Sequence, residues 1–125
     1  MTATRDARSA PFFDALAEGT LLLRRCVSHG HLSAPEVLFC AFCGSPELEW
    51  VPARGGGHIV TWTAIHTRPD ETGATSVGVT IGIVELDEGP WLRARLLAPE
   101  VHSGQRVAFE VVQTEGEPIY AFRPA

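Results

Sequence analysis

The chain has 125 residues, a formal net charge of −5, and 45% hydrophobic against 20% charged residues. This length suits one ordinary domain or two small ones that share an interface. The negative charge argues against a general nucleic-acid binder, because neutralising phosphates needs a basic surface. No apolar run approaches the roughly 20 residues of a membrane span, so we expect a soluble globular protein that makes no use of a membrane.

A short helix is expected at residues 11–19, near the start of the chain. Pro11 suits a first helical turn, Gly19 suits the position after the last turn, and Ser9 is the expected N-cap. No apolar signal segment precedes this helix, which predicts a cytoplasmic protein. A short strand should follow it at residues 21–25; residues 32–39 should then return the chain with a bend at Pro35, and residues 50–52 should complete this part.

Two pairs of metal-ligand residues lie among these segments at the spacing of a zinc ribbon. They are Cys26-x-x-His29 and Cys40-x-x-Cys43, with ten residues between His29 and Cys40. Zinc binds four thiolates or imidazoles in a tetrahedron, and two tight knuckles provide that geometry. We predict structural zinc on these four residues, with His31 as the competing histidine. The alternative is a ribbon without metal, in which the cysteines pack as small buried residues.

The run Arg54-Gly55-Gly56-Gly57 is the clearest internal boundary, and its composition predicts a flexible junction. Beyond it, β-branched and apolar residues alternate with polar ones, as they do in half-buried strands. Five short strands fit a small closed or partly open barrel. They are expected at residues 58–67, 77–83, 91–96, 107–111 and 119–122. The sequence thus predicts a mainly β chain with two parts, residues 1–53 and 54–125.

Four side chains of the second part, His66, Trp91, Arg93 and Arg95, are candidates for a binding surface. Trp91, Arg93 and Arg95 alternate with apolar residues, so they should form an outward row. Arginine pairs well with phosphate, and both residue types are common at interfaces, but a solvated barrel face explains the row equally well. His66 lies beside a loop at residues 68–75 that is long for a hairpin. An ordinary hydrogen-bonded histidine is the other interpretation of His66.

Taken in order, these motifs resemble the bacterial and archaeal family that joins a rubredoxin-like zinc ribbon to an OB-fold. That family was long described as a domain of unknown function and is associated with thiolases and acyl-CoA metabolism. The usual first knuckle of the family is Cys-x-x-Cys-Gly-His, so His29 replaces one expected cysteine here. The matching motifs are Pro11-Phe12-Phe13, Leu23-Arg24-Arg25-Cys26, Cys40-x-x-Cys43-Gly44-Ser45, Gly57-x-x-x-Thr61-x-Thr63, Ile83-Val84-Glu85-Leu86-Asp87-Glu88-Gly89-Pro90, and Ala121-Phe122-Arg123-Pro124.

The resemblance implies a short helix, a zinc ribbon and a five-stranded OB barrel. It also implies a non-catalytic accessory subunit of a thiolase-fold or lipid-transfer-protein-like acyl-CoA complex, with a heterotetramer as the expected assembly. The partner would bind most of the acyl-CoA and supply the catalytic residues, and the resemblance makes His66, Trp91, Arg93 and Arg95 candidates for facing the partner or the CoA thioester. The implied chemistry is retro-aldol or thiolytic carbon–carbon bond cleavage or formation, for example in steroid or lipid side-chain degradation. The alternative is a nucleic-acid-binding module, because zinc ribbons and OB-folds both serve that role.

Overall fold

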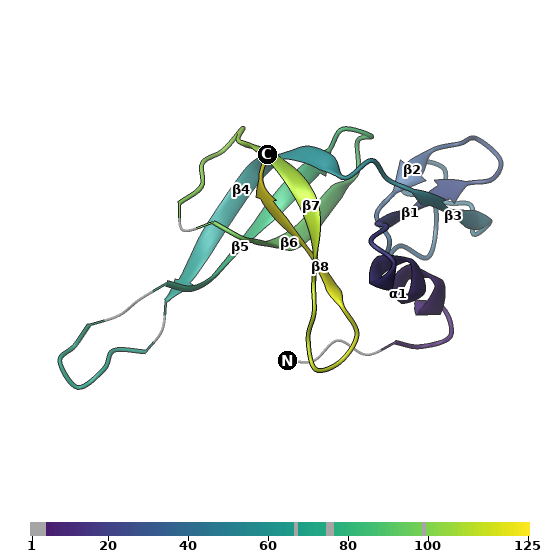
Figure 1. The fold of residues 1–125 in the computed structure, drawn as a ribbon. Coiled ribbons are helices and arrows are strands. Elements are labelled where there is room, and N and C mark those ends of the chain that lie inside the picture. The colour runs from purple at the N-terminus through teal and green to yellow at the C-terminus, as the bar shows by residue number, and fades with distance from the viewer. Residues whose placement is uncertain (1–4, 67, 75–76, 99) are drawn as a thin grey trace.

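The computed structural model describes residues 5–66, 68–74, 77–98 and 100–125 and shows one short helix and two β-sheets (Figure 1). The fold class predicted from the sequence is confirmed. Over the described part of the chain, no helix has both the length and the apolar character needed to cross a membrane. The elements are α1 (Ala10–Ala17), β1 (Leu22–Cys26), β2 (Leu32–Ser33), β3 (Leu48–Pro52), β4 (Gly56–His66), β5 (Val77–Leu86), β6 (Trp91–Leu96), β7 (Arg106–Val112) and β8 (Ile119–Pro124).

The N-terminal part consists of α1 packed beside a small antiparallel sheet with the order β2-β1-β3. Pro11 lies in the first turn of α1, and Gly19 follows the helix with a φ of 87°, a value that suits glycine. Ser9 stands at the N-cap position but makes no side-chain capping bond. Its amide instead donates to the Asp6 carboxylate at 2.8 Å. The expected position of the cap is therefore correct, and its expected hydrogen bond is not.

The five later strands form a closed barrel with the order β4-β5-β6-β8-β7. All neighbouring pairs are antiparallel except β6 and β8, which run parallel. A chain that closes a five-stranded barrel in this way has an OB-like topology. The barrel and the N-terminal part share one continuous hydrophobic core, in which Leu16 and Leu23 pack with Leu92 and Phe122. The division at residues 53 and 54 therefore stays a prediction, although the two sheets end and begin on either side of it.

The glycine run is not the flexible junction that its composition suggests. Gly56 and Gly57 are the first residues of β4, and they pair with Ala108 and Val107 of β7. A β-carbon at Gly57 would lie 2.5 Å from the carbonyl oxygen of Glu85. The prediction of a flexible junction is wrong because glycine is needed here to let two strands pack closely. A glycine that permits close packing cannot be told from a glycine in a flexible linker by sequence alone.

Strands β4 and β5 continue past the barrel as a two-stranded arm (Figure 1). β4 pairs with β7 only over residues 56–58, and β5 pairs with β6 only over residues 81–85. Further out, the pairs Ala64↔Thr80 and Ile65↔Val79 belong to the arm alone. The side chains of Trp62 and Ile65 are 43% and 50% exposed. The predicted strand end at Thr67 lies outside the described residues.

Tyr120 gives the fold a measurable dependence on alkaline pH. Burial raises its pKa to about 12, with a smaller contribution from the negative charge of Glu36. The neutral phenol donates a hydrogen bond to the Arg93 carbonyl oxygen at 3.1 Å. A raised pKa favours the protonated form in the folded state, so the stabilisation is complete below pH 10 and is lost as pH rises toward 12. We expect the free energy of unfolding to fall by at most about 3 kcal/mol over that range.

Urea unfolding measured between pH 10 and pH 12 tests this expectation. Tyr120→Phe is the control, because it removes the ionisable group and should remove most of the pH dependence. The chain contains a single tyrosine, so tyrosinate absorbance reports the ionisation of Tyr120 directly. Titration at the pKa of a free tyrosine would show that the prediction is wrong.

Candidate metal centre and outer barrel face

The two predicted knuckles adopt the same backbone turn at the end of the three-stranded sheet. The amide of Gly30 donates to the Cys26 carbonyl at 2.7 Å, and the amide of Gly44 donates to the Cys40 carbonyl at 2.9 Å. Both glycines have positive φ, at 75° and 76°, where other residues are strained. Glycine therefore occupies the position in each knuckle where the chain reverses direction. These two turns direct the ligand side chains of each knuckle toward the other knuckle.

Five potential metal ligands gather between these knuckles. The sulfurs of Cys26 and Cys43 are 3.6 Å apart, and the sulfur of Cys40 is 3.6 Å from Nδ1 of His31. The ligand atoms of Cys26, His29, His31 and Cys43 all lie within 4.8 Å of one another. The rings of His29 and His31 stack with centroids 5.6 Å apart. This set has one member more than a tetrahedral site takes.

The structure thus brings three of the four predicted ligands into one group and adds His31 to it. Cys40 lies outside that group of four, but its sulfur lies beside both the His31 ring and the Cys43 thiol. The choice of Cys26, His29, Cys40 and Cys43 as the ligand set remains a prediction. His31 was recognised in the sequence as a competitor because it follows His29 by two residues. In sequence, His31 is farther from Cys26 than His29 is, which counts against it as a metal ligand. Its position beside Cys40 in the structure makes it a stronger candidate for the fourth ligand position than that spacing indicates.

The electrostatics of the three thiols suit a bound cation. Burial raises the pKa of Cys40, but the backbone amides of Cys43 and Phe42 and the His31 ring outweigh it and bring the pKa down to about 6. The amide of Ser45 lowers the pKa of Cys43, but the neighbouring thiols and burial outweigh that effect and raise it. Three such sulfurs cannot all ionise side by side without a positive charge between them. Thiolates with imidazoles are the ligands that zinc prefers, so the residues fit a zinc ion, which would hold the two knuckles together.

The predicted outward row on β6 is confirmed. Trp91, Arg93 and Arg95 are exposed, whereas Leu92, Ala94 and Leu96 between them are buried. Trp91 is 56% exposed, and its indole N–H donates to a Glu85 carboxylate oxygen at 2.8 Å.

Glu85 also lies 3.3 Å from Nε2 of His58 on β4. The sequence does not reveal that His58 neighbours Glu85, because the two residues are 27 positions apart. They come together only when β4 and β5 pair in the register His58↔Glu85.

An apolar depression of about 500 Å³ adjoins the row where β5, β6 and β8 meet α1. Val79, Ile81 and Ile119 line it together with Arg93 and Arg95. Within the described residues, neither arginine has a carboxylate within 4 Å. Apolar surface beside free guanidinium groups is the composition of many protein interfaces.

His66 does not join this row. It ends β4 at the far end of the arm, opposite Val77, whereas Trp91 lies opposite Glu85 on the same strand β5. Eight residues of β5 separate these two positions, a span of about 26 Å. His66 is exposed, and the turn beyond it is organised by Asp70, whose carboxylate accepts hydrogen bonds from the amides of Thr72 and Ala74. Residue 75, at the end of the predicted loop, lies outside the described residues.

Comparison with known proteins identifies relatives of both parts of the chain. Residues 50–112 match the sequence profile of the ChsH2 C-terminal OB-fold domain. A solved structure described as the Ltp2–ChsH2(DUF35) aldolase superposes with a TM-score of 0.78, at 26% identity over 98% of each chain. A DUF35-family protein of unknown function from Sulfolobus solfataricus has the same fold, with a TM-score of 0.67 at 15% identity, over 95% of this chain and 86% of that one.

Two further relatives are similar in sequence. One is a probable enoyl-CoA hydratase alpha subunit of Thermomonospora curvata, 29% identical over 94% of this chain. The other is a DUF35 domain-containing scaffold protein of Pyrococcus furiosus, 32% identical over 54% of this chain. The chain spans 37% of the length of the first relative and 49% of the second. Because the profile covers half of the chain and the fold is shared from end to end, the chain belongs to the DUF35 family that includes the OB-fold domain of ChsH2.

Proposed function

We propose that this chain is a non-catalytic accessory subunit of an acyl-CoA-processing complex whose catalytic partner has a thiolase or lipid-transfer-protein-like fold. The observation that supports this most strongly is the similarity over 98% of both chains to the Ltp2–ChsH2(DUF35) aldolase. The name of the Pyrococcus relative, a scaffold protein, and that of the Thermomonospora relative, a subunit of a CoA enzyme, point in the same direction. The complex would act in the cytoplasm.

The chemistry of the chain agrees with a supporting role. A metal centre filled by four protein ligands leaves no open coordination position, so its zinc would be structural rather than catalytic. The partner would supply the catalytic residues and most of the acyl-CoA site, and the reaction would be retro-aldol or thiolytic cleavage, as in steroid or lipid side-chain degradation. Thiolase-like dimers have twofold symmetry, so two copies of this chain on one dimer would give a heterotetramer.

The outer barrel face is the surface that we assign to this partner. Trp91, Arg93 and Arg95 project from β6 beside the apolar depression, and His66 on the arm would make a second, separate contact. A two-stranded hairpin is only marginally stable in water on its own. Contact with a partner would therefore order the arm and cover its exposed Trp62 and Ile65.

Gentle co-purification from the native host tests the proposal. We expect a stoichiometric thiolase-like or lipid-transfer-protein-like protein, and a CoA thioester that is turned over only when both chains are present. Turnover of the thioester by this chain alone, or the absence of such a partner from cells that express one, would rule the proposal out. Nucleic acid in the sample that withstands moderate salt would instead favour the alternative of a nucleic-acid-binding module.

Reversing the charge of the arginine row should break this complex without unfolding the subunit. We expect Arg93→Glu combined with Arg95→Glu to weaken binding of the partner at least about tenfold, because interfacial arginines are frequent hot spots. Titration calorimetry with the co-purified partner measures the change, and the melting temperature should stay within a few degrees of the parent chain. Arg25→Glu combined with Arg123→Glu, two exposed arginines outside β6, changes the net charge by the same amount, so it is the matched control and should bind normally. Equal loss in both variants would indicate an effect of net charge alone.

A further inference from the structure

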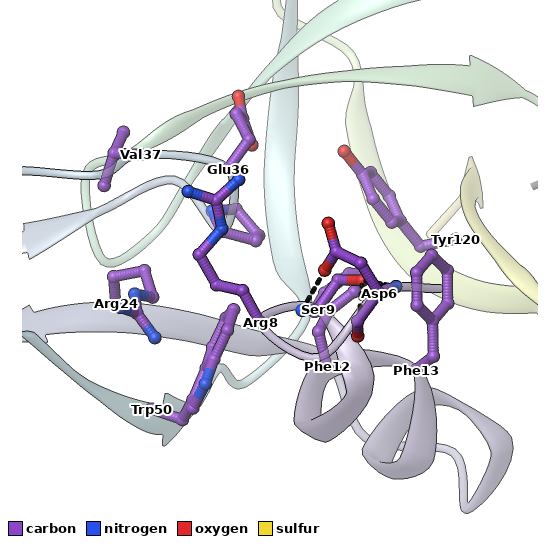
Figure 2. Close-up of a pocket in the computed structure, with 11 residues that line it drawn as sticks. Asp6, Arg8, Ser9, Phe12, Phe13, Arg24, Glu36, Val37, Trp50 and Tyr120 are labelled. Atoms are coloured by element: carbon purple, nitrogen blue, oxygen red, sulfur yellow. Dashed lines mark hydrogen bonds between the residues drawn. The ribbon is translucent and has the colours of Figure 1, made fainter. Parts of the chain in front are cut away.

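A pocket of about 270 Å³ lies between the N-terminal part and β8, away from the candidate metal centre, and it shares Phe12, Phe13 and Tyr120 with the apolar depression beside the arginine row. Its walls come from the segment before α1, from β1 and β3, and from the loop that follows β2 (Figure 2). Arg8 and Arg24 provide its positive charge, Trp50 forms its floor with Arg24, and Val37 and Tyr120 supply apolar surface. This volume is below the roughly 300 Å³ at which pockets for drug-sized ligands begin, so an occupant must be small.

Arg24 is the unusual residue of this pocket. Its guanidinium carbon lies 4.2 Å from the centroid of the Trp50 ring, within the range of a cation–π interaction. Its Nε is buried and has no hydrogen-bond partner in the described part of the chain. Burial lowers the pKa of Arg24, and so does the positive charge of Arg8. The next residue, Arg25, faces the other way and donates to a Glu49 carboxylate oxygen at 2.6 Å.

Arg8 has an opposite charge nearby, because its positive charge helps to lower the pKa of Asp6, whereas Arg24 has no carboxylate partner among the described residues. The Asp6 carboxylate accepts a hydrogen bond from the Ser9 amide at 2.8 Å, before the start of α1. Glu36 lines the pocket and is exposed to solvent. No carboxylate lies within 4 Å of Arg8 or Arg24, as far as the structure describes the chain. A buried guanidinium N–H without an acceptor is costly, so an incoming anion would satisfy a group that the protein leaves unpaired.

We propose that this pocket binds a small monocarboxylic acid with a compact apolar body. Its carboxylate would accept hydrogen bonds from Arg24 and Arg8, since guanidinium and carboxylate groups match in geometry. Its apolar part would pack against Phe13, Val37 and Tyr120. The negative charge of Glu36 selects against dianions, including phosphate monoesters. The assignment stands whether or not the chain works with a thiolase-like partner.

The test uses 4-fluorobenzoate as the probe, observed by fluorine NMR with the purified 125-residue chain. We expect line broadening that saturates with a dissociation constant of about 1 mM, a usual affinity for a ligand of this size. The uncharged isostere 4-fluorobenzamide should bind at least about tenfold more weakly, because it cannot form the charge-assisted hydrogen bonds. Equal binding of the two probes, or no binding of either, would refute the proposal.

Two variants locate the binding site on the arginines. Arg24→Met keeps the apolar stem against Trp50 and should raise the dissociation constant at least about tenfold. Arg25→Met, the neighbour that points away from the pocket, should leave it unchanged. Arg8→Met provides a second measurement that does not disturb the core, because Arg8 is exposed and precedes α1. Unchanged binding in both Arg8→Met and Arg24→Met would place the probe elsewhere. The probe should also bind to the co-purified complex, and its exclusion there would mean that the partner covers the pocket and that no free acid fills it in the assembly.

Discussion

Cys26→Ser is expected to abolish stoichiometric zinc binding and to destabilise the three-stranded sheet. Cys26 is fully buried at the end of β1, and its sulfur is 3.6 Å from that of Cys43. A serine hydroxyl is a poor zinc ligand, and a structural ion that binds only the folded state stabilises it by mass action. The loss amounts to about 4 kcal/mol when free zinc stands about a thousandfold above the dissociation constant. Elemental analysis gives the zinc content, and hydrogen exchange of β1 and β3 amides gives the local stability.

The two histidines provide the matched comparison for this prediction. If His29 completes the set with the three cysteines, His29→Asn should lower zinc affinity about tenfold to a hundredfold more than His31→Asn does. The reverse order would assign the fourth position to His31, whose Nδ1 already lies 3.6 Å from the sulfur of Cys40. Full zinc content in Cys26→Ser would show that this cluster is not the metal site. Absence of zinc from the parent chain would support a ribbon held only by packing.

Phe122→Ala is the substitution with the largest expected effect on the barrel. Phe122 is the largest of the fully buried side chains, and it lies on β8 opposite Leu96 of β6 and Phe109 of β7. Its removal leaves a cavity where the barrel core meets the core under α1, so neighbours can collapse into it only in part. We expect a loss of about 3–5 kcal/mol in the free energy of unfolding, measured by urea denaturation.

Arg123→Ala supplies the control for that measurement. Arg123 is the next residue of β8, points to solvent, and has only a distant carboxylate neighbour, Glu110, at 4.0 Å. Exposed substitutions of this kind change stability by about 0.5 kcal/mol or less. A loss under about 1 kcal/mol in Phe122→Ala would mean that the barrel core relaxes around the cavity, and that the closed barrel is looser than its packing indicates.

The strands of the barrel could be predicted from the sequence because each keeps one face in the core. Trp91 to Leu96 alternates strictly between exposed and buried side chains, and that period of two is visible in the residues themselves. The sequence predicts a bend at Pro35 within residues 32–39, and in the structure only Leu32 and Ser33 of this segment pair with β1. Strand β2 does not continue past Ser33, because Pro35 lacks the amide that pairing with a neighbouring strand requires. The chain then turns toward the second knuckle.

The sites were less accessible to prediction, because their geometry depends on pairing between distant residues. The knuckles are local motifs, so sequence spacing located all five candidate ligands and favoured His29 over His31, a choice that stays a prediction. Arg24 and Trp50 are 26 positions apart and meet only because β1 and β3 pair in the register Arg24↔Trp50. The only local signal was a charged and an aromatic residue in two short strands, a combination that is common on any sheet.

The parallel pairing of β6 with β8 also constrains when the protein can fold during synthesis. β8 is the last of the five barrel strands in the sequence, and in the barrel it lies between β6 and β7. The other four barrel strands are therefore synthesised before the strand that closes the barrel. Until Ile119–Pro124 leaves the ribosome, β6 and β7 present unpaired edges to the surroundings. The helix and ribbon are complete some 70 residues earlier, by Pro52. A nascent chain would therefore carry an open sheet and an N-terminal part whose core still lacks Phe122, and both would stay incompletely covered until the final strand arrives.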